Sequence, residues 1–153
     1  MVSDPRPLVA AIPDPELPVV SIGDLGVLRS VEASADGTVV VTVTPTYSGC
    51  PALDAIRDEI RATLAAHGFE RVEVKTVLSP AWTTDWISER GRARLRGLGI
   101  APPRPQPLLE LAVRCPRCGS ASTRLVSRFG STACTAHRVC NDCAEPFDHF
   151  KEL

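Results

Sequence analysis

A chain of 153 residues has room for one ordinary domain, or for a domain of about 100 residues and a small module. Its 44% hydrophobic residues, 23% charged residues and formal net charge of −1 are typical of a soluble globular protein and give no electrostatic reason to expect nucleic acid or an anionic membrane as partner. No apolar run approaches the ~18 residues of a transmembrane helix, and the first residues, MVSDPRPLVAAIPDP, lack the apolar core of a secretory signal. We therefore expect a cytoplasmic protein.

The first clear elements are two strands joined by a turn. Apolar and polar residues alternate over 27–33 and again over 39–44, which is the period of a strand with two different faces. The pair Asp36 and Gly37 between them is a turn signal. The two segments predict a β-hairpin.

A helix is predicted directly after the hairpin. Apolar residues fall at helical spacing at Leu53, Ile56, Ile60 and Leu64. Pro51 suits the first helical position, where no N–H is needed, and Gly68 provides a C-terminal stop.

Two further elements complete the first domain. Alternation over Arg71–Leu78 predicts a third strand, and a second helix is expected from near Asp85 to Arg96, with Trp82 and Trp86 at its start. The order is β-β-α-β-α, preceded by a short helix or loop. We expect a small α+β domain over residues 1–100, with helices on one face of a mixed sheet.

A proline-rich stretch separates this domain from the tail. In GIAPPRPQPLLE, residues 99–110, four prolines stand within six residues, so neither a helix nor a central strand is expected there. We predict an extended linker over 101–110 and a small module over 111–153.

Six cysteines are distributed unevenly, with Cys50 alone in the first hundred residues. Two C-x-x-C pairs, Cys115 with Cys118 and Cys140 with Cys143, are separated by 21 residues. Without a secretory signal, such pairs indicate metal binding rather than disulfides. Two C-x-x-C turns can direct four thiolates at one tetrahedral ion, so the tail is predicted to be a zinc ribbon with structural zinc.

The tail offers other candidate ligands and one alternative function. Cys134 is either a small buried residue or a spare ligand that would let the module hold iron or an iron–sulfur cluster, and His137 and His149 are candidates on the same logic. Zinc ribbons also bind nucleic acid. Four thiolates around one Zn²⁺ would leave this module near neutral, however, so nucleic-acid binding is disfavoured.

The joint TPTYSGCP, residues 44–51, places Cys50 where the first long helix begins. The partial positive charge of a helix N-terminus is expected to lower the pKa of such a thiol. Cys50 is then either a small apolar residue or a reactive or metal-binding thiolate. His67 is 17 positions further on, about 25 Å along a helix that rises ~1.5 Å per residue, so it is too far away to be the base of a thiol enzyme.

Three segments of the first domain resemble a known family. IPDPELPVVSIGDLGVL, TPTYSGCPALD and LSPAWTTDWISERGRARLRGLGIAPP are similar to the iron–sulfur-assembly domain of SufT-like maturation factors. The tail adds CPRCGS, FGSTAC and EPFDHFKEL. The combination resembles the PaaD family, which belongs to the bacterial phenylacetyl-CoA ring-1,2-epoxidase systems of phenylacetate degradation.

The resemblance implies a non-catalytic accessory protein. Its relatives assist iron–sulfur cluster assembly, and the epoxidase has a di-iron oxygenase subunit and a reductase subunit with flavin and a [2Fe–2S] cluster. Maturation of one of these centres is the implied task, with the ribbon as a zinc-stabilised docking module. Cys50 would be a transient ligand with Asp24 beside it. The implied site residues are Asp14, Glu16, Asp24, Thr46, Gly49 and Cys50.

Two alternatives stay open from the sequence. The chain would instead be a structural subunit of the oxygenase, with no chemistry at Cys50, or, less in keeping with its charge, a nucleic-acid-binding ribbon. We expect the reductase or oxygenase subunits as partners, no membrane and no nucleic acid, and leave homo-oligomerisation open.

Overall fold

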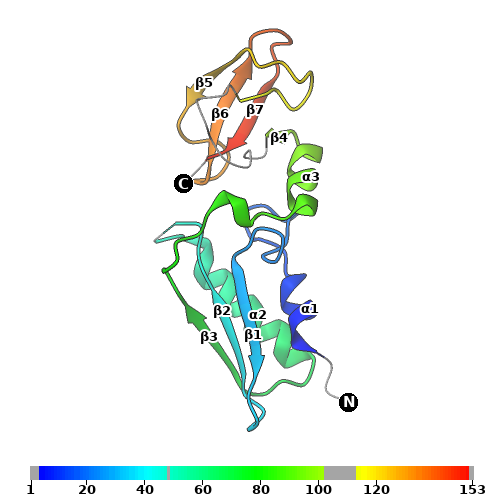
Figure 1. The fold of residues 1–153 in the computed structure, drawn as a ribbon, viewed down its shortest axis with the longest axis vertical. Coiled ribbons are helices and arrows are strands. Elements are labelled where there is room, and N and C mark those ends of the chain that lie inside the picture. Colours follow the sequence, from blue (N-terminus) through cyan, green and yellow to red (C-terminus); the bar gives the residue numbers. More distant parts are fainter. Residues whose placement is uncertain (1–3, 48, 102–112, 152–153) are drawn as a thin grey trace. The chain divides into compact units, whose positions relative to one another are not determined.

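Two separate sheets organise the described residues, 4–47, 49–101 and 113–151 of the computed structural model (Figure 1). Each sheet lies in its own unit, and the units divide between Ser88 and Glu89. None of the described helices is long and apolar enough to span a membrane.

The sheet of the first unit has three strands in the order β1-β2-β3. The antiparallel pair of β1 (Leu28–Ala33) and β2 (Val39–Val43) is the predicted hairpin, and the N–H of Thr38 donates to Asp36 Oδ1 at 3.1 Å in its turn. β3 (Val72–Thr76) pairs parallel to β2, so the sheet is mixed, as predicted.

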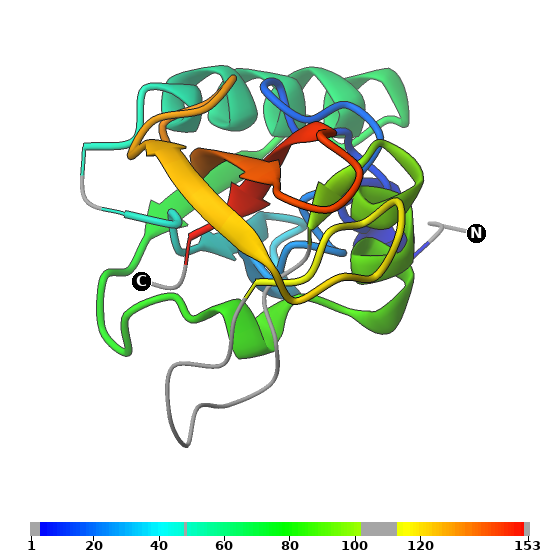
Figure 2. The same cartoon turned by 90° about the horizontal axis from the view of Figure 1, so that it is seen from above.

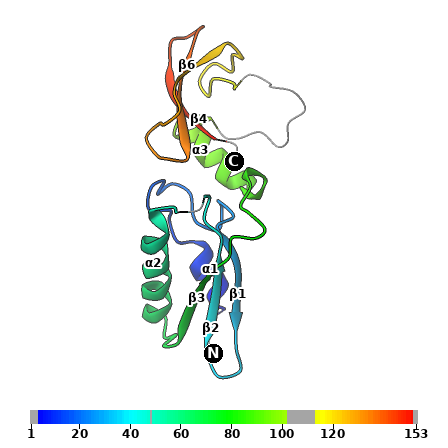
Figure 3. The same cartoon turned by 90° about the vertical axis from the view of Figure 1, so that its left-hand side faces the viewer.

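Helix α2 (Ala52–Ala66) makes the crossover that this parallel pair needs and covers one face of the sheet (Figure 3). It begins one residue after Pro51 and ends at Ala66, and Gly68, two residues further on, reverses the chain with its φ of +87°. The short helix α1 (Pro5–Ala10) contacts both α2 and β1, so it joins the same layer.

The core lies between this layer and β2. Val39, Val41 and Val43 alternate as buried residues along the strand, each at most 1% exposed. Helix α2, which covers the sheet, carries its own row of buried residues, Ile56, Ile60 and Leu64 (Figure 3). Burial of each such aliphatic side chain contributes about 1.5–3 kcal/mol. The buried residues, every second one along the strand and every third or fourth one along the helix, are therefore the main source of stability of the unit.

The second predicted helix begins later than expected. A 3₁₀ turn, η1 (Thr84–Trp86), is followed by Ile87 in an extended conformation, and helix α3 (Glu89–Gly97) starts only after Ser88. The cause is a distant contact: the N–H of Ser88 donates to the carbonyl oxygen of Asp24 at 2.8 Å. A residue fixed in this way cannot continue the helix back to Asp85.

The division of the chain also differs from the expected one. The sequence boundary at residue 100 leaves α3 in the first domain, whereas in the structure α3 groups with the second unit. The helix contacts β4 (Ile100–Ala101), which pairs parallel to β7 (Pro146–Phe150). Ala101, the first residue of the predicted linker, is therefore in a strand, and the rest of that linker lies outside the described residues.

The second unit is built on the sheet β4-β7-β6-β5. β5 (Thr123–Ser127) and β6 (Thr135–Cys140) are antiparallel, as are β6 and β7, and Figure 2 shows these three strands side by side. The predicted ribbon is thus present as a meander with β5 at its edge.

One glycine of the first unit makes a close approach. Gly26 has a φ of +75°, and a Cβ added there would lie 2.5 Å from the Cβ and 2.7 Å from the carbonyl oxygen of Trp86. Nearby, the indole N–H of Trp82 donates to the carbonyl oxygen of Leu25 at 2.8 Å. Residues 82–86, which precede α3, therefore pack against the turn of residues 24–26.

A pair of glycine variants tests this packing. Gly37 has a φ of +84° but no atom within 4 Å of an added Cβ, so Gly37→Ala should cost only the left-handed strain of about 1–2 kcal/mol. Gly26→Ala should cost a further ~1–3 kcal/mol because Trp86 must move. Urea unfolding followed by tryptophan fluorescence measures both. Equal losses would contradict the close packing.

Candidate functional site

The four paired cysteines converge at one point of the second unit. The Sγ atoms of Cys115, Cys118, Cys140 and Cys143 all lie within 4.8 Å of one another. Cys115 Sγ is 3.7 Å from Cys143 Sγ, and Cys118 Sγ is 3.6 Å from Cys140 Sγ. Thiolates around a tetrahedral zinc ion at ~2.3 Å stand about 3.8 Å apart, so the cluster has the size of such a site.

The two C-x-x-C turns have matching backbone geometry. The N–H of Cys115 donates to the carbonyl oxygen of Ser120, and the N–H of Cys140 to that of Glu145, both at 2.9 Å. The residue after each pair is left-handed, with a φ of +75° at Gly119 and +62° at Ala144. Two equivalent turns thus present their thiols to one another, which is the arrangement that a shared metal ion requires.

Backbone donors favour the ionised form of one thiol in this cluster, that of Cys140, whereas desolvation and neighbouring sulfur atoms raise the pKa of Cys118 and Cys143. The N–H of Cys143 donates to Cys140 Sγ at 3.5 Å, and this bond is the largest cause that lowers the pKa of the Cys140 thiol to about 7. Cys115 and Cys140 also pack against Ala101 and Phe147 as a small apolar core. The site is therefore held by apolar packing on one side and offers thiolates suited to a metal cation.

The other candidate ligands of the tail lie elsewhere. Cys134 is buried, with its Sγ 2.9 Å from Thr132 Oγ1, and His137 Nδ1 is 3.2 Å from Asp148 Oδ1. Burial, and secondarily the charge of Arg138, lower the pKa of His149 to about 4. Over the described part of the chain, the four paired cysteines are the His, Cys, Asp and Glu side chains that gather closely enough to share an ion.

Cys50 lies half-buried between β2 and α2. Burial is the largest cause that raises the pKa of its thiol, and the charges of Glu16 and Asp14 raise it further. Hydrogen bonds from the Ala52 N–H and the Tyr47 side chain lower the pKa but do not compensate. The lowered pKa expected from the helix start is therefore wrong, because burial and two carboxylates outweigh the N-terminal N–H groups.

Asp14 organises the acidic turn whose charges act on this thiol. Its Oδ1 accepts from the N–H of Glu16 at 2.9 Å and from that of Leu17 at 2.8 Å, and burial raises the pKa of its carboxyl group. Because its carboxylate accepts hydrogen bonds from two backbone N–H groups of the turn, Asp14 fixes the backbone that carries Glu16. Of the predicted carboxylates, Glu16 and Asp14 are therefore those whose charges act on the thiol of Cys50.

Asp24 has a different set of contacts. Its side chain is 2% exposed, and Ser88 Oγ donates to its Oδ1 at 2.9 Å. Its own N–H donates to Ser21 Oγ at 3.0 Å. These bonds direct Asp24 towards the segment before α3, whereas Glu16 and Asp14 are the carboxylates that most affect the thiol of Cys50.

The remaining site residues belong to the loop before α2. Thr46 is half-buried, and Gly49 is exposed with a φ of +80°. Sequence reasoning missed Tyr47, which hydrogen-bonds the thiol. Its place three residues before Cys50 in the quoted joint was the available signal. Ser88 was also missed, and nothing local in the sequence links it to Asp24.

Comparisons with known proteins match both units. A family model described as "Iron-sulfur cluster assembly protein" covers residues 8–76, and one described as "PaaD zinc beta ribbon domain" covers residues 101–151. A protein of Escherichia coli K12 that is named as the D component of 1,2-phenylacetyl-CoA epoxidase is 50% identical over 147 residues. The match spans 94% of this chain and 88% of that protein.

Two further relatives match over the first unit. The "Fe-S protein maturation auxiliary factor" of Porphyromonas gingivalis is 35% identical over 58% of this chain and 84% of that protein. The crystal structure of a "Domain of Unknown Function DUF59" from Bacillus anthracis matches with a TM-score of 0.56 and 29% identity, over 60% of this chain and 87% of that one. The α+β fold is therefore shared with that domain.

The metal centre predicts a clear loss on substitution. Cys115→Ser should abolish stoichiometric metal binding and loosen the second unit, because a module with so small a core depends on its ion. Cys134→Ser, a matched change outside the cluster, should keep the metal. Elemental analysis of both purified variants measures this, and an unchanged metal content in Cys115→Ser would overturn the assignment.

The charges of the acidic turn, Asp14 and Glu16, predict that the thiol of Cys50 reacts slowly with alkylating agents. Removing one charge with Glu16→Gln should lower the pKa of Cys50 and speed its alkylation by iodoacetamide at pH 8 about two- to fivefold, because only the thiolate reacts. Asp58→Asn, an equal charge change on the exposed side of α2, should have little effect. Mass-spectrometric mapping of Cys50 follows the rate. Equal rates in the two variants would refute the influence of Glu16.

Proposed function

We propose a specific task for this chain, which belongs to the PaaD family of 1,2-phenylacetyl-CoA epoxidase components: it assists the assembly of the iron–sulfur cluster or the di-iron centre in another subunit of that epoxidase. Relatives named as Fe–S protein maturation factors support the accessory role. The observation that carries the proposal is the thiol of Cys50 beside the acidic turn of Asp14 and Glu16.

This arrangement suits a cation that arrives and leaves. At rest the raised pKa keeps the Cys50 thiol protonated and makes it a poor nucleophile, which argues against a thiol enzyme. The negative charges that raise this pKa also attract an iron cation. When the cation approaches, its charge outweighs theirs, the thiol loses its proton, and the thiolate becomes a soft ligand.

Too few ligands are present for permanent storage. Iron–sulfur clusters are usually held by about four protein ligands, and Cys50 is the single cysteine of the first unit. A single thiolate, drawn on by the charges of Glu16 and Asp14 but not joined by them as a close ligand set, would release iron to a client that offers a complete set. Asp24 would act indirectly in this scheme, by fixing the segment before α3 through Ser88.

The second unit would supply stability and docking. We assign zinc as the resident ion of the four cysteines, because the spacing of their sulfur atoms fits a closed tetrahedral site and leaves no open position for chemistry. Such an ion contributes folding free energy and takes no part in the transfer.

A second candidate function is a stoichiometric structural component of the oxygenase. The name of the Escherichia coli relative, which describes it as part of the epoxidase, favours this function. In that case the protein would co-purify with the oxygenase in equal amounts, and substitution of Cys50 would leave epoxidation intact.

Substitution of Cys50 separates the two functions. Cys50→Ser should fold and keep its zinc but lower epoxidase activity at least ~10-fold in cells that depend on this protein, because a hydroxyl is a poor ligand for iron. Cys134→Ser serves as a control with the same chemical change at a position outside both sites. Full activity of Cys50→Ser, at equal protein level, would exclude the ligand role.

A further inference from the structure

Strand β5 is the edge of the second sheet and exposes apolar side chains. It pairs with β6 on one side, and no described strand lies on its other side. Leu125 is 49% exposed, Val126 is 50% exposed, and Phe129, just after the strand, is 67% exposed. An apolar strand at the edge of a sheet is a template for another strand, and natural proteins usually blunt or cover it.

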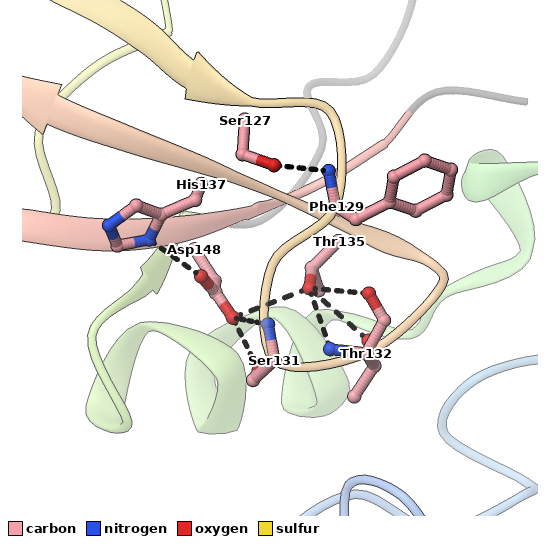
Figure 4. Close-up of polar contacts among 7 residues, drawn as sticks. All are labelled: Ser127, Phe129, Ser131, Thr132, Thr135, His137 and Asp148. Carbon is pink, nitrogen blue, oxygen red and sulfur yellow. Dashed lines mark hydrogen bonds and ion pairs between the residues drawn. The ribbon is translucent and has the colours of Figure 1, made fainter.

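Phe129 is fixed in place although it is exposed. Its N–H donates to Ser127 Oγ at 3.1 Å, which fixes the turn that follows β5 (Figure 4). On its other side, Lys151 donates from Nζ to the carbonyl oxygen of Arg128 at 3.1 Å and lies 4.4 Å from the centre of the Phe129 ring. Contacts with Ser127 and Lys151 therefore hold the Phe129 ring in its exposed position.

A largely buried carboxylate anchors the rest of that loop. Asp148 on β7 accepts from the N–H of Ser131 at 2.8 Å, from the Ser131 hydroxyl, from Thr135 Oγ1 at 3.3 Å and from His137 Nδ1 at 3.2 Å (Figure 4). Gly130 passes so close that an added Cβ would lie 2.6 Å from Asp148 Oδ1. A loop ordered in this way loses little entropy when Phe129 is covered.

The charge around this edge is positive. Arg124 and Arg128 are exposed, and no carboxylate of the described residues forms an ion pair with either. Three acids of the ribbon are engaged elsewhere, since Glu145 pairs with Arg117, Asp142 accepts from the Ser120 hydroxyl, and Asp148 anchors the loop. A partner that covers the apolar side chains must also satisfy two guanidinium groups.

We propose that the β5 surface, defined as Arg124, Leu125, Val126, Arg128 and Phe129, docks an extended acidic and apolar segment of a partner protein. The segment adds a strand to the outer edge of β5, places an apolar side chain against Phe129 and pairs carboxylates with the two arginines. The proposed function enters only in the identity of the partner, a subunit of the epoxidase.

Nucleic acid fits this surface less well. Phe129 is the one aromatic ring of the β5 surface, whereas Leu125 and Val126 are aliphatic and add no platform for successive bases, and two arginines give few phosphate contacts. Main-chain pairing at a strand edge is instead the usual mode by which proteins bind extended peptides.

The direct test uses peptides and nuclear magnetic resonance on the zinc-loaded full chain. A short soluble peptide that alternates Glu with Val should shift the amide signals of residues 123–127 and the ring signals of Phe129, whereas a Lys–Val peptide should not. Absence of shifts with the acidic peptide would overturn the proposal. Stronger shifts with a single-stranded oligonucleotide, or self-association in sedimentation that β5 substitutions abolish, would also overturn it in favour of nucleic acid or a second copy.

The second arm uses the purified reductase and oxygenase subunits of the epoxidase. Arg124→Glu combined with Arg128→Glu, and separately Phe129→Ser, should weaken binding to one subunit at least ~10-fold. Arg61→Glu combined with Arg96→Glu, an equal charge change on exposed helical positions, should not. Cys50→Ser should bind normally. Unchanged binding of the β5 variants would refute this docking surface and leave the role of Cys50 to its own test.

Discussion

The parallel pairing of β2 with β3 is the constraint from which the thiol site follows. A parallel pair cannot be closed by a turn, so the chain must cross the sheet, and α2 makes that crossover. The loop that enters α2 therefore stands at the end of a central strand, where Cys50 is half-buried and the charges of Glu16 and Asp14 raise the pKa of its thiol. The pKa of the thiol is a product of this topology.

The second unit obeys a different constraint, the convergence of four sulfur atoms. Two equivalent turns bring them together, and the small apolar core around Cys115, Cys140 and Phe147 closes one side. Because the ion would stabilise so much of the module, strand β5 is free to expose apolar residues at the edge. In the proposed function, one site would bind iron transiently and the other would provide a supported docking surface.

Much of the fold could be predicted because its signals are local. The hairpin and α2 follow from periods of two and 3.6, and each C-x-x-C pair sets its own turn. The predictions that were wrong depend on contacts between residues that are far apart in the sequence. The start of α3 is set by the bond between Ser88 and Asp24, 64 positions apart, and the pKa of Cys50 by carboxylates from a separate turn. The hydrophobic periodicity of the sequence does not reveal such distant pairs. The predicted second helix therefore starts too early, and the predicted pKa of the Cys50 thiol is too low.

In the proposed function, this protein helps to load iron into a subunit of the epoxidase. The most direct measurement is the iron and cluster content of the reductase and oxygenase subunits, each purified from cells with and without this protein. The account predicts that one of the two is markedly under-loaded in its absence and is restored by the wild-type chain but not by Cys50→Ser. Equal loading of both subunits in the presence and absence of the protein would contradict it.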